Sequence, residues 1–269
     1  MRKITEATEF LKWKGFADAK AGIVLGTGLG SFVQFMEVEN AIPYHDIPHF
    51  PLSTVESHKG QLLVGKVGAV RIIAMQGRFH YYEGYSMQQI TFPVRVLKAL
   101  GIENLLLSNA AGGMNPAFKK GDLVLIDDHI NQLPGNPLRG VNDAAFGNRF
   151  VDMSQPYNPR LNQLLMDVAG DMHVDLKKGV YVAVPGPNLE TRAEYRYLRN
   201  MGADMVGMST IPEVIVANQV GLACAAISVI TDECDPDNLK PVDITEIIEV
   251  AGRADGTLSK LFQQFFQRL

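Results

Sequence analysis

Six residues near the C-terminus, DECDPD (232–237), bring four carboxylates and one thiol together shortly after an apolar run, AAISVI. Such a cluster could bind a metal, act as a general acid and base, contact a substrate or form a solvated turn. It contains no histidine and fits neither zinc nor EF-hand calcium spacing. The six histidines elsewhere also lack metal-ligand spacing. We therefore expect no metal, and a metal-dependent hydrolase is kept only as a third hypothesis.

A second group of reactive side chains lies in QGRFHYYEGYS (76–86), directly after the apolar run AVRIIAM. Arg78, His80 and Tyr82 alternate along this segment, so an extended backbone would place them on one side. Arginine offers a planar fork for phosphate oxygens, and histidine adds a hydrogen bond or a proton. The spacing predicts an anion site at a strand end.

Two glycine-rich segments, GTGLGS (26–31) and SNAAGGMNP (108–116), also follow apolar runs. Small residues at such turns expose backbone amides that can bind phosphate, and Thr27 adds a hydroxyl. Ser31 occupies the position of the last glycine of a dinucleotide fingerprint, and no acidic residue follows about twenty positions later. These segments favour phosphate binding and argue against a dinucleotide site.

Two further turns carry polar groups: Glu190 in VPGPNLETRAEY (184–195) and Ser209 with Thr210 in VGMSTIPE (206–213). Glu190 could cap a helix or accept hydrogen bonds from a flat polar ligand. The chain has no GxSxG, HExxH or CxxC motif. The pattern predicts chemistry by positioning and electrostatics, without a covalent intermediate or cofactor.

Short β-branched runs alternate with amphipathic stretches, which is typical of an α/β protein. We expect a single domain over residues 1–269, with a central mixed, mostly parallel β-sheet flanked by helices. The long segment 128–157, rich in Asn, Pro and Gly, is predicted to be functional or disordered. The expected strands are 21–26, 61–67, 69–75, 104–110, 122–128, 179–184 and 224–232, and the expected helices are 87–101, 158–172, 190–202 and 244–269.

The composition limits the classes of partner. Net charge is −4, with lysine and arginine spread along the chain, so nucleic-acid binding is not expected. No apolar stretch is long enough to cross a bilayer, and the N-terminal residues lack the apolar core of a signal peptide. Two cysteines do not make a disulfide framework. We expect a cytoplasmic protein.

Six motifs resemble, in order, those of the trimeric, low-molecular-mass purine nucleoside phosphorylases: GTGLG, QGRFHYYEGY, NAAGGMNP, GDLVLIDDHIN, GPNLETRAEY and GADMVGMSTIPEVIVA. The resemblance implies a homotrimer that converts a purine nucleoside and phosphate into free base and ribose 1-phosphate. It implies phosphate contacts from Thr27, His58, Arg78, His80, the Ala110 amide and Ser209. It implies ribose and base contacts from Tyr82, Phe150, Leu189, Glu190, Met208 and Asp232, with Phe150 lent by a neighbouring subunit. His80, Glu190 and Asp232 would be the catalytic residues.

Two positions depart from that family. Asp232 stands where many members have Asn, and the histidine expected near Thr245, at the ribose 5′-hydroxyl, is absent. An ionised Asp only accepts hydrogen bonds, which suits the amine of adenine, whereas Glu190 suits 6-oxopurines. We expect a phosphorylase of inosine and guanosine. The alternatives are a phosphorylase preferring adenosine or 5′-methylthioadenosine, and a non-catalytic nucleoside-binding protein.

Overall fold

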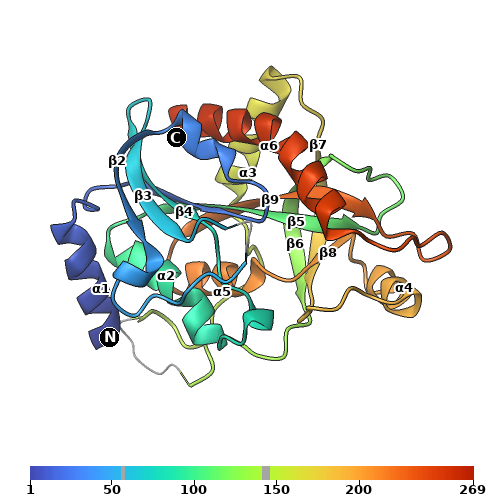
Figure 1. Cartoon of the computed structure of the whole chain (residues 1–269), viewed down its shortest axis with the longest axis horizontal. Helices are drawn as coiled ribbons and strands as arrows, with labels where there is room; N and C mark the ends of the chain where they lie inside the picture. The colour runs from blue at the N-terminus through green and yellow to red at the C-terminus, as the bar shows by residue number, and fades with distance from the viewer. Residues whose placement is uncertain (56–57, 141–145) are drawn as a thin grey trace.

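The structure is a computed structural model that describes residues 1–55, 58–140 and 146–269. Its strands form one mixed sheet in the order β2-β3-β4-β1-β5-β8-β7-β6-β9, with β5 also paired to β9 (Figure 1). That last pairing closes the second half of the sheet on itself. The strands are β1 (Ala21–Leu25), β2 (Glu37–Pro43), β3 (Gln61–Val67), β4 (Val70–Gln76), β5 (Asn104–Gly113), β6 (Leu123–Asn131), β7 (Leu176–Ala183), β8 (Met205–Gly207) and β9 (Ala223–Glu233).

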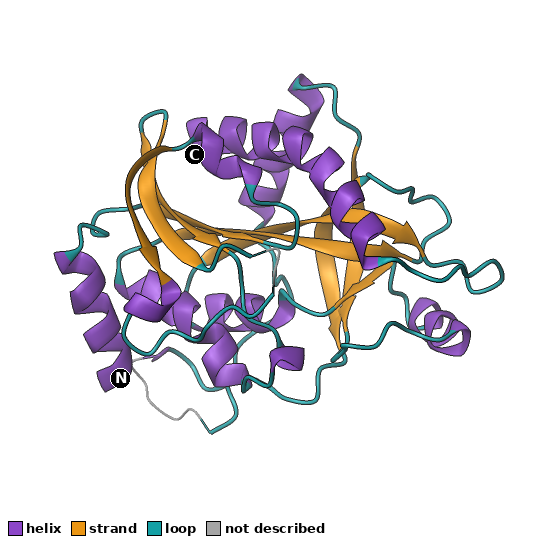
Figure 2. Ribbon diagram, in the orientation of Figure 1, coloured by secondary structure: helices purple, strands orange, loops and turns teal. Residues whose placement is uncertain are grey.

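Helices cover both faces of this sheet (Figure 2). Helices α1, α2 and α5 pack in one apolar core, and α3 and α6 pack in the other. Helix α4 lies at one end, against a smaller cluster. The helices are α1 (Arg2–Trp13), α2 (Met87–Ala99), α3 (Pro159–Asp171), α4 (Arg192–Asn200), α5 (Ile211–Gln219) and α6 (Ile244–Gln267).

The two cores follow from the period of two along a strand. In β5, Leu105 and Leu107 face the first core, whereas Leu106 faces the second. Strands buried on both faces read as continuous apolar runs because each alternate residue meets a different layer of helices. This is why the central strands could be predicted from the sequence.

The structure confirms the predicted α/β fold and finds every predicted strand and helix, with shifted ends. Four elements are absent from the predicted strands and helices: α1, β2, β8 and α5, of which β8 has only three residues. β2 is largely exposed and has no apolar alternation, and α5 is apolar and β-branched on all sides because it is almost wholly buried. α1 buries Ile4, Ala7 and Leu11 at helical spacing, so its signal was present in the sequence.

Segment 128–157 begins as the end of β6, and its described residues 132–140 and 146–157 form largely irregular backbone before α3, whose cap is Asn158. Residues 141–145 of this segment lie outside the described residues. None of the helices in the described ranges combines the length and apolar character needed to span a bilayer.

The loop after β1 is pressed between a strand and a helix. A Cβ at Gly26 would lie 2.6 Å from the Ser108 carbonyl oxygen of β5. A Cβ at Gly28, whose φ is +73°, would lie 2.9 Å from Ala251 Cβ of α6. Glycine is required at both positions because no side chain fits, and this close approach determines where Thr27 between them lies.

We predict that Gly28→Ala lowers the free energy of unfolding by about 2–5 kcal/mol, because positive φ and overpacking both act there. Gly15→Ala is the matched control, since Gly15 also has positive φ but open space around its Cα. It should cost only about 1–2 kcal/mol. Urea unfolding of both variants measures the difference, and equal losses would contradict the contact with α6.

Candidate active site

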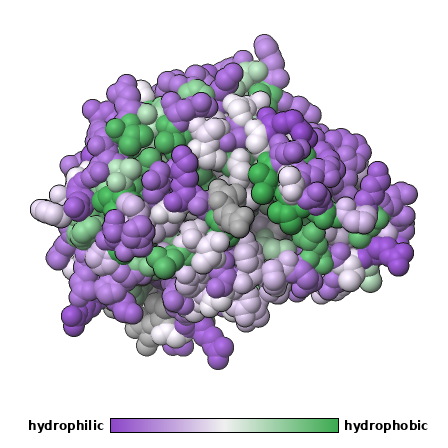
Figure 3. Space-filling model, in the orientation of Figure 1, coloured by the Kyte–Doolittle hydropathy of each residue, from purple (hydrophilic) through white to green (hydrophobic). Residues whose placement is uncertain are grey.

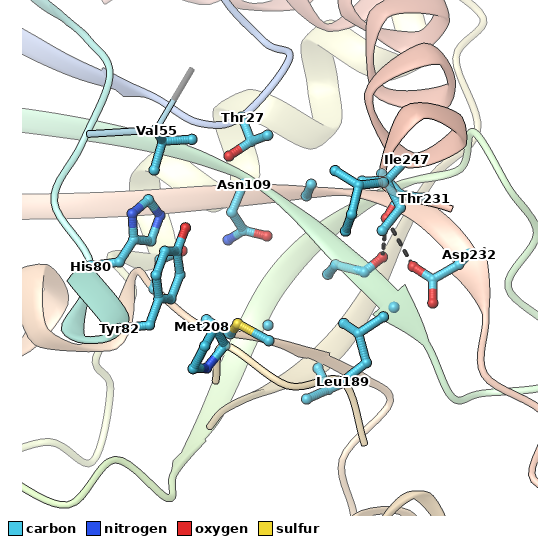
Figure 4. A pocket seen from close by; sticks show the side chains of 18 of the residues that line it. Thr27, Val55, His80, Tyr82, Asn109, Leu189, Met208, Thr231, Asp232 and Ile247 are labelled. Atoms are coloured by element: carbon cyan, nitrogen blue, oxygen red, sulfur yellow. Dashed lines mark hydrogen bonds between the residues drawn. The ribbon is translucent and has the colours of Figure 1, made fainter. Parts of the chain in front are cut away.

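A cavity of about 430 Å³ opens where the ends of β4, β5, β8 and β9 meet the start of α6. This volume is within the range of small-ligand sites. Figure 4 shows His80 and Tyr82 on one side of it and Leu189 and Asp232 on the other, with Met208 between them. The cavity therefore has two ends with different chemistry.

Arg78 provides the positive charge of the first end. Its side chain is only 2% exposed, and its Nε donates to Glu213 Oε1 of α5 at 3.0 Å. Its Nη1 donates to the Ser108 carbonyl at 2.7 Å and to Ser209 Oγ at 3.2 Å. Nη2 also lies 3.0 Å from Glu213 Oε1, but it makes no hydrogen bond to that oxygen or to any other described residue. A buried cation needs a counter-charge, and Glu213 supplies it while leaving donor capacity for an anion.

Ser209 is placed by a strained turn. Thr210 has φ +68° and ψ −52°, and the Ile211 amide donates to the Ser209 carbonyl at 2.7 Å, which together make a γ-turn. This conformation costs a β-branched residue about 1–3 kcal/mol. Asn109 Nδ2 donates to Thr210 Oγ1 at 2.9 Å and helps to hold the turn. The strained turn holds the Ser209 hydroxyl oxygen beside the Arg78 guanidinium, from which it accepts a hydrogen bond.

His80 is neutral at pH 7, because burial lowers its pKa below the ordinary value of 6.5. Its Nδ1 lies 2.8 Å from Glu83 Oε1, so Nδ1–H donates and Nε2 is left as an acceptor. Burial raises the pKa of Glu83, but hydrogen bonds from His80 and Thr54 outweigh this and lower it to about 2. Tyr82 stacks on the imidazole, with ring centroids 4.6 Å apart.

His58 lies next to this end of the cavity, where it contacts Thr27 and the backbone of Arg78. Burial, with smaller effects of His80 and Arg78, lowers its pKa to about 3. Its Nδ1 accepts from the Arg78 amide at 3.4 Å, so the proton of the neutral ring is on Nε2, 3.4 Å from Thr27 Oγ1. A donating Nε2–H leaves the Thr27 hydroxyl hydrogen free to point elsewhere.

The second end holds two carboxylates. Asp232 Oδ1 accepts from the Thr231 hydroxyl and Oδ2 accepts from the Cys234 thiol, each at 3.0 Å. Burial raises the pKa of Glu190 above 4.5, the Tyr195 hydroxyl opposes this, and the charge of Asp232 adds to it. Burial also raises the pKa of Cys234, so it remains a thiol. This end is therefore rich in hydrogen-bond acceptors.

Helix α6 closes the cavity with an apolar wall. Ile244, Ile247 and Ile248 face inward at helical spacing, together with Val55. Ile244 is 60% exposed and Ile248 is 39% exposed. Figure 3 shows hydrophobic residues gathered beside the N-terminal half of this helix. An apolar surface that lines a cavity and remains uncovered is suited to contact a ligand.

Most of the predicted site residues meet in this one cavity: Thr27, Arg78, His80, Tyr82, Ala110, Leu189, Glu190, Met208, Ser209 and Asp232. His58 is adjacent, behind Thr27. Phe150 lies elsewhere: it is 88% exposed and lines a separate hollow with His129 and Arg139. Its role as an aromatic lent to a neighbouring subunit stays a prediction.

Sequence reasoning missed the supporting residues. Glu213, Glu83 and Asn109 touch the predicted side chains from α5, the turn after β4 and β5. Tyr195 and the isoleucines of α6 also line the cavity. No local pattern marks these residues, because each acts through a partner distant in sequence or in a turn. The helical spacing of Ile244 and Ile248 alone could equally have indicated a buried face.

The other three acidic residues of DECDPD do not line this cavity. Glu233 contacts Lys119, Asp237 contacts Arg196, and Asp235 accepts hydrogen bonds from its own turn. All three are exposed. Among residues 1–55, 58–140 and 146–269, no group of three or more His, Cys, Asp or Glu is arranged to hold a metal ion.

Comparison with known proteins gives consistent results. Residues 20–267 match the model of the phosphorylase superfamily. Purine nucleoside phosphorylase 1 of Geobacillus stearothermophilus is 52% identical over 91% of this chain and 90% of its own. The protein of the same name from Bacillus subtilis is 49% identical over 96% of both. The structure of isoform 2 of Schistosoma mansoni purine nucleoside phosphorylase, in complex with cytosine and ribose-1-phosphate, has a TM-score of 0.95 at 39% identity. It covers 100% of this chain and 96% of that chain.

We predict that Glu213→Ala lowers the free energy of unfolding by about 3–5 kcal/mol, because it leaves the Arg78 charge buried without a partner. Glu103→Ala is the control: Glu103 pairs with Lys20 at the surface, where an ion pair is worth about 0–1 kcal/mol. Denaturant unfolding compares them. A loss below about 1 kcal/mol at Glu213 would show that Arg78 is compensated in some other way.

Proposed function

The chain belongs to the phosphorylase superfamily and, within it, to the purine nucleoside phosphorylases, which are pentosyltransferases, and we propose that it acts on 6-oxopurine nucleosides. The observation that carries this proposal is the division of one cavity, with Arg78, His80 and Ser209 at one end and Glu190 at the other. The first set suits phosphate and the carboxylate suits the N1–H of hypoxanthine or guanine. The ribose then lies between them, beside Tyr82 and Met208.

Phosphate binds where donors converge. Arg78 contributes its positive charge and its Nη2, which lies near Glu213 without a hydrogen bond, and Ser209, Thr27 and the Ala110 amide add neutral donors. His58 orients Thr27 by donating to its oxygen, so that the Thr27 hydroxyl hydrogen is directed at the anion. His80 Nε2 is an acceptor and suits the one proton of hydrogen phosphate. Inorganic phosphate is the only co-substrate that this mechanism needs.

The reaction is a displacement at C1′ of the ribose. The C1′–N9 bond breaks and its electron pair goes to the purine, while a phosphate oxygen forms the new bond to C1′. Positive charge on the sugar develops next to the bound phosphate, and negative charge develops on the base. Groups that interact most strongly with these charges lower the barrier, which is how positioning alone catalyses the step.

Glu190 recognises the base. As a carboxylate it accepts from N1–H and from a 2-amino group, and these hydrogen bonds become stronger as the base gains negative charge. Leu189 lies against the flat face of the purine. Asp232 meets the other edge, where it accepts from N7–H or, with a proton shared, contacts O6.

A second candidate is a preference for adenosine or 5′-methylthioadenosine. The observation that favours it is the apolar wall of Ile244, Ile247 and Ile248, which has no donor for a 5′-hydroxyl. Asp232, which accepts from a thiol and a hydroxyl, also offers acceptor oxygens that suit an exocyclic amine.

We further propose a homotrimer in which Phe150 reaches the site of a neighbouring subunit. Its 88% exposure in the single chain leaves a large apolar ring uncovered, which an interface would bury.

A substrate panel tests the base and the 5′ group together. We predict phosphate-dependent release of base from inosine and guanosine with kcat/KM at least tenfold above that for adenosine and 5′-methylthioadenosine. Inosine and adenosine differ only in the base, whereas adenosine and 5′-methylthioadenosine differ only in the 5′ group. The panel therefore separates the preference for the base from the preference for the 5′ group. Inert inosine and guanosine, with turnover of methylthioadenosine, would overturn the first proposal in favour of the second.

The raised pKa of Glu190 predicts the pH dependence of recognition. The acceptor form exists only above that pKa, so kcat/KM for inosine should fall as the pH is lowered through a value above 4.5. Glu190→Gln should lose roughly 10- to 150-fold in kcat/KM, since a hydrogen bond to a charged group is worth about 1.5–3 kcal/mol. It should also lack this acid limb. An unchanged limb in Glu190→Gln would assign the titration to another group.

A further inference from the structure

Asp255 is a buried carboxylate that the proposed reaction does not use. It lies in α6 and is 4% exposed. Its Oδ2 accepts from the Ser31 amide at 2.8 Å and from the Ser31 hydroxyl, and its Oδ1 accepts from Ser259 Oγ at 2.9 Å. No Lys, Arg or His in the described ranges forms an ion pair with it. Its polar contacts among the described residues are hydrogen bonds alone.

This arrangement has a high free-energy cost if its only role is to join Ser31 to α6. Burying a carboxylate without a cation carries a large desolvation penalty, and a neutral acceptor would satisfy the same Ser31 amide. Charge-assisted hydrogen bonds are shorter and about twice as strong as neutral ones. The carboxylate therefore gives a firmer link between Ser31 and α6 than a neutral residue could.

The link begins at the phosphate end of the cavity. Ser31 follows directly after the loop that carries Thr27, and that loop is pressed against α6 at Gly28, whose added Cβ would meet Ala251. The position of the Thr27 hydroxyl therefore depends on the position of α6. Figure 4 shows Thr27 and Ile247 facing the cavity from the same side.

The link ends at the nucleoside wall. Ile247 and Ile248 are seven to eight residues before Asp255 in α6, roughly 10–12 Å along the helix. A helix transmits displacement over this length as a rigid body. Movement of its isoleucines toward a bound nucleoside would therefore shift Ala251 and Asp255, and with them the loop that holds Thr27.

We propose that Asp255 is a positioning residue that joins the phosphate subsite to the apolar nucleoside wall, so that binding of either substrate favours binding of the other. This inference rests on the proposed function, because it takes the Thr27 end as the phosphate subsite. Coupling of this kind is reciprocal, so each ligand must raise the affinity for the other by the same factor.

The test is a titration of inorganic phosphate into the full chain, alone and saturated with an inosine analogue whose base and sugar are joined by a carbon–carbon bond that phosphate cannot cleave. In the wild type we expect the analogue to tighten phosphate binding by about 5-fold or more. In Asp255→Ala this factor should fall to about 1, and phosphate KM should rise about tenfold with a smaller change in kcat. Asp255→Asn, which keeps one acceptor oxygen, should restore part of the coupling.

Ser259→Ala is the matched control. It removes a hydrogen bond from the same carboxylate and the 3.5 Å contact between the Ser259 and Ser31 hydroxyls, but it leaves both hydrogen bonds from Ser31 to Asp255. It should therefore lower stability without lowering the coupling factor. Ser31→Ala keeps the amide donor and should lose only part of the coupling, which covers the case in which Asp255→Ala does not fold. Full coupling in Asp255→Asn and Ser31→Ala, or equal loss in Ser259→Ala, would overturn the inference.

Arg78→Ala separates this inference from the proposed function. Phosphate binding that survives in Arg78→Ala would show that the phosphate subsite is elsewhere, and the proposed function would fail with it. Phosphate binding that is lost in Arg78→Ala, together with full coupling in the Asp255 variants, would overturn only the role of Asp255.

Discussion

The burial of Arg78, a residue only 1% exposed, is the constraint on which the arrangement of this site depends. The charge of Arg78 cannot remain in a protein interior without compensation, and three elements converge to provide it. α5 supplies Glu213, β5 supplies the Ser108 carbonyl, and the strained turn before α5 supplies Ser209. Because Glu213 takes only part of the fork, the same charge remains available to an anion in the cavity.

The neutral histidines follow from the same burial. His80 and His58 lie against one another with ring centroids 5.6 Å apart, close to a permanent positive charge, and this environment disfavours a further cation. Each ring is then fixed in one tautomer by its Nδ1 partner, Glu83 for His80 and the Arg78 amide for His58. The phosphate end thus has one full positive charge surrounded by oriented neutral groups, which suits an anion that must bind and then react.

The opposite end of the cavity has the opposite chemistry, with Glu190 and Asp232 as acceptors and no Lys or Arg lining it among the residues that the structure describes. This polarity matches a reaction that moves electrons from the sugar to the base while phosphate arrives from the other side. α6 lies over both ends, and through its contacts with the Thr27 loop and with the cavity it meets both substrates in the proposed arrangement.

The sequence by itself determined most of the strands, most of the helices and most of the polar residues that line the cavity. Central strands buried on both sides are continuous apolar runs, and residues such as Arg78 and Ser209 follow them at turns where strand ends meet. The elements without such patterns were missed: α5 is apolar all round and β2 is a polar edge. Only the tertiary structure could decide the partners, because Glu213 lies 135 residues from Arg78 and Asp255 lies 224 residues from Ser31. Charge compensation depends on distance in space, and a linear sequence does not contain that distance until the chain has folded.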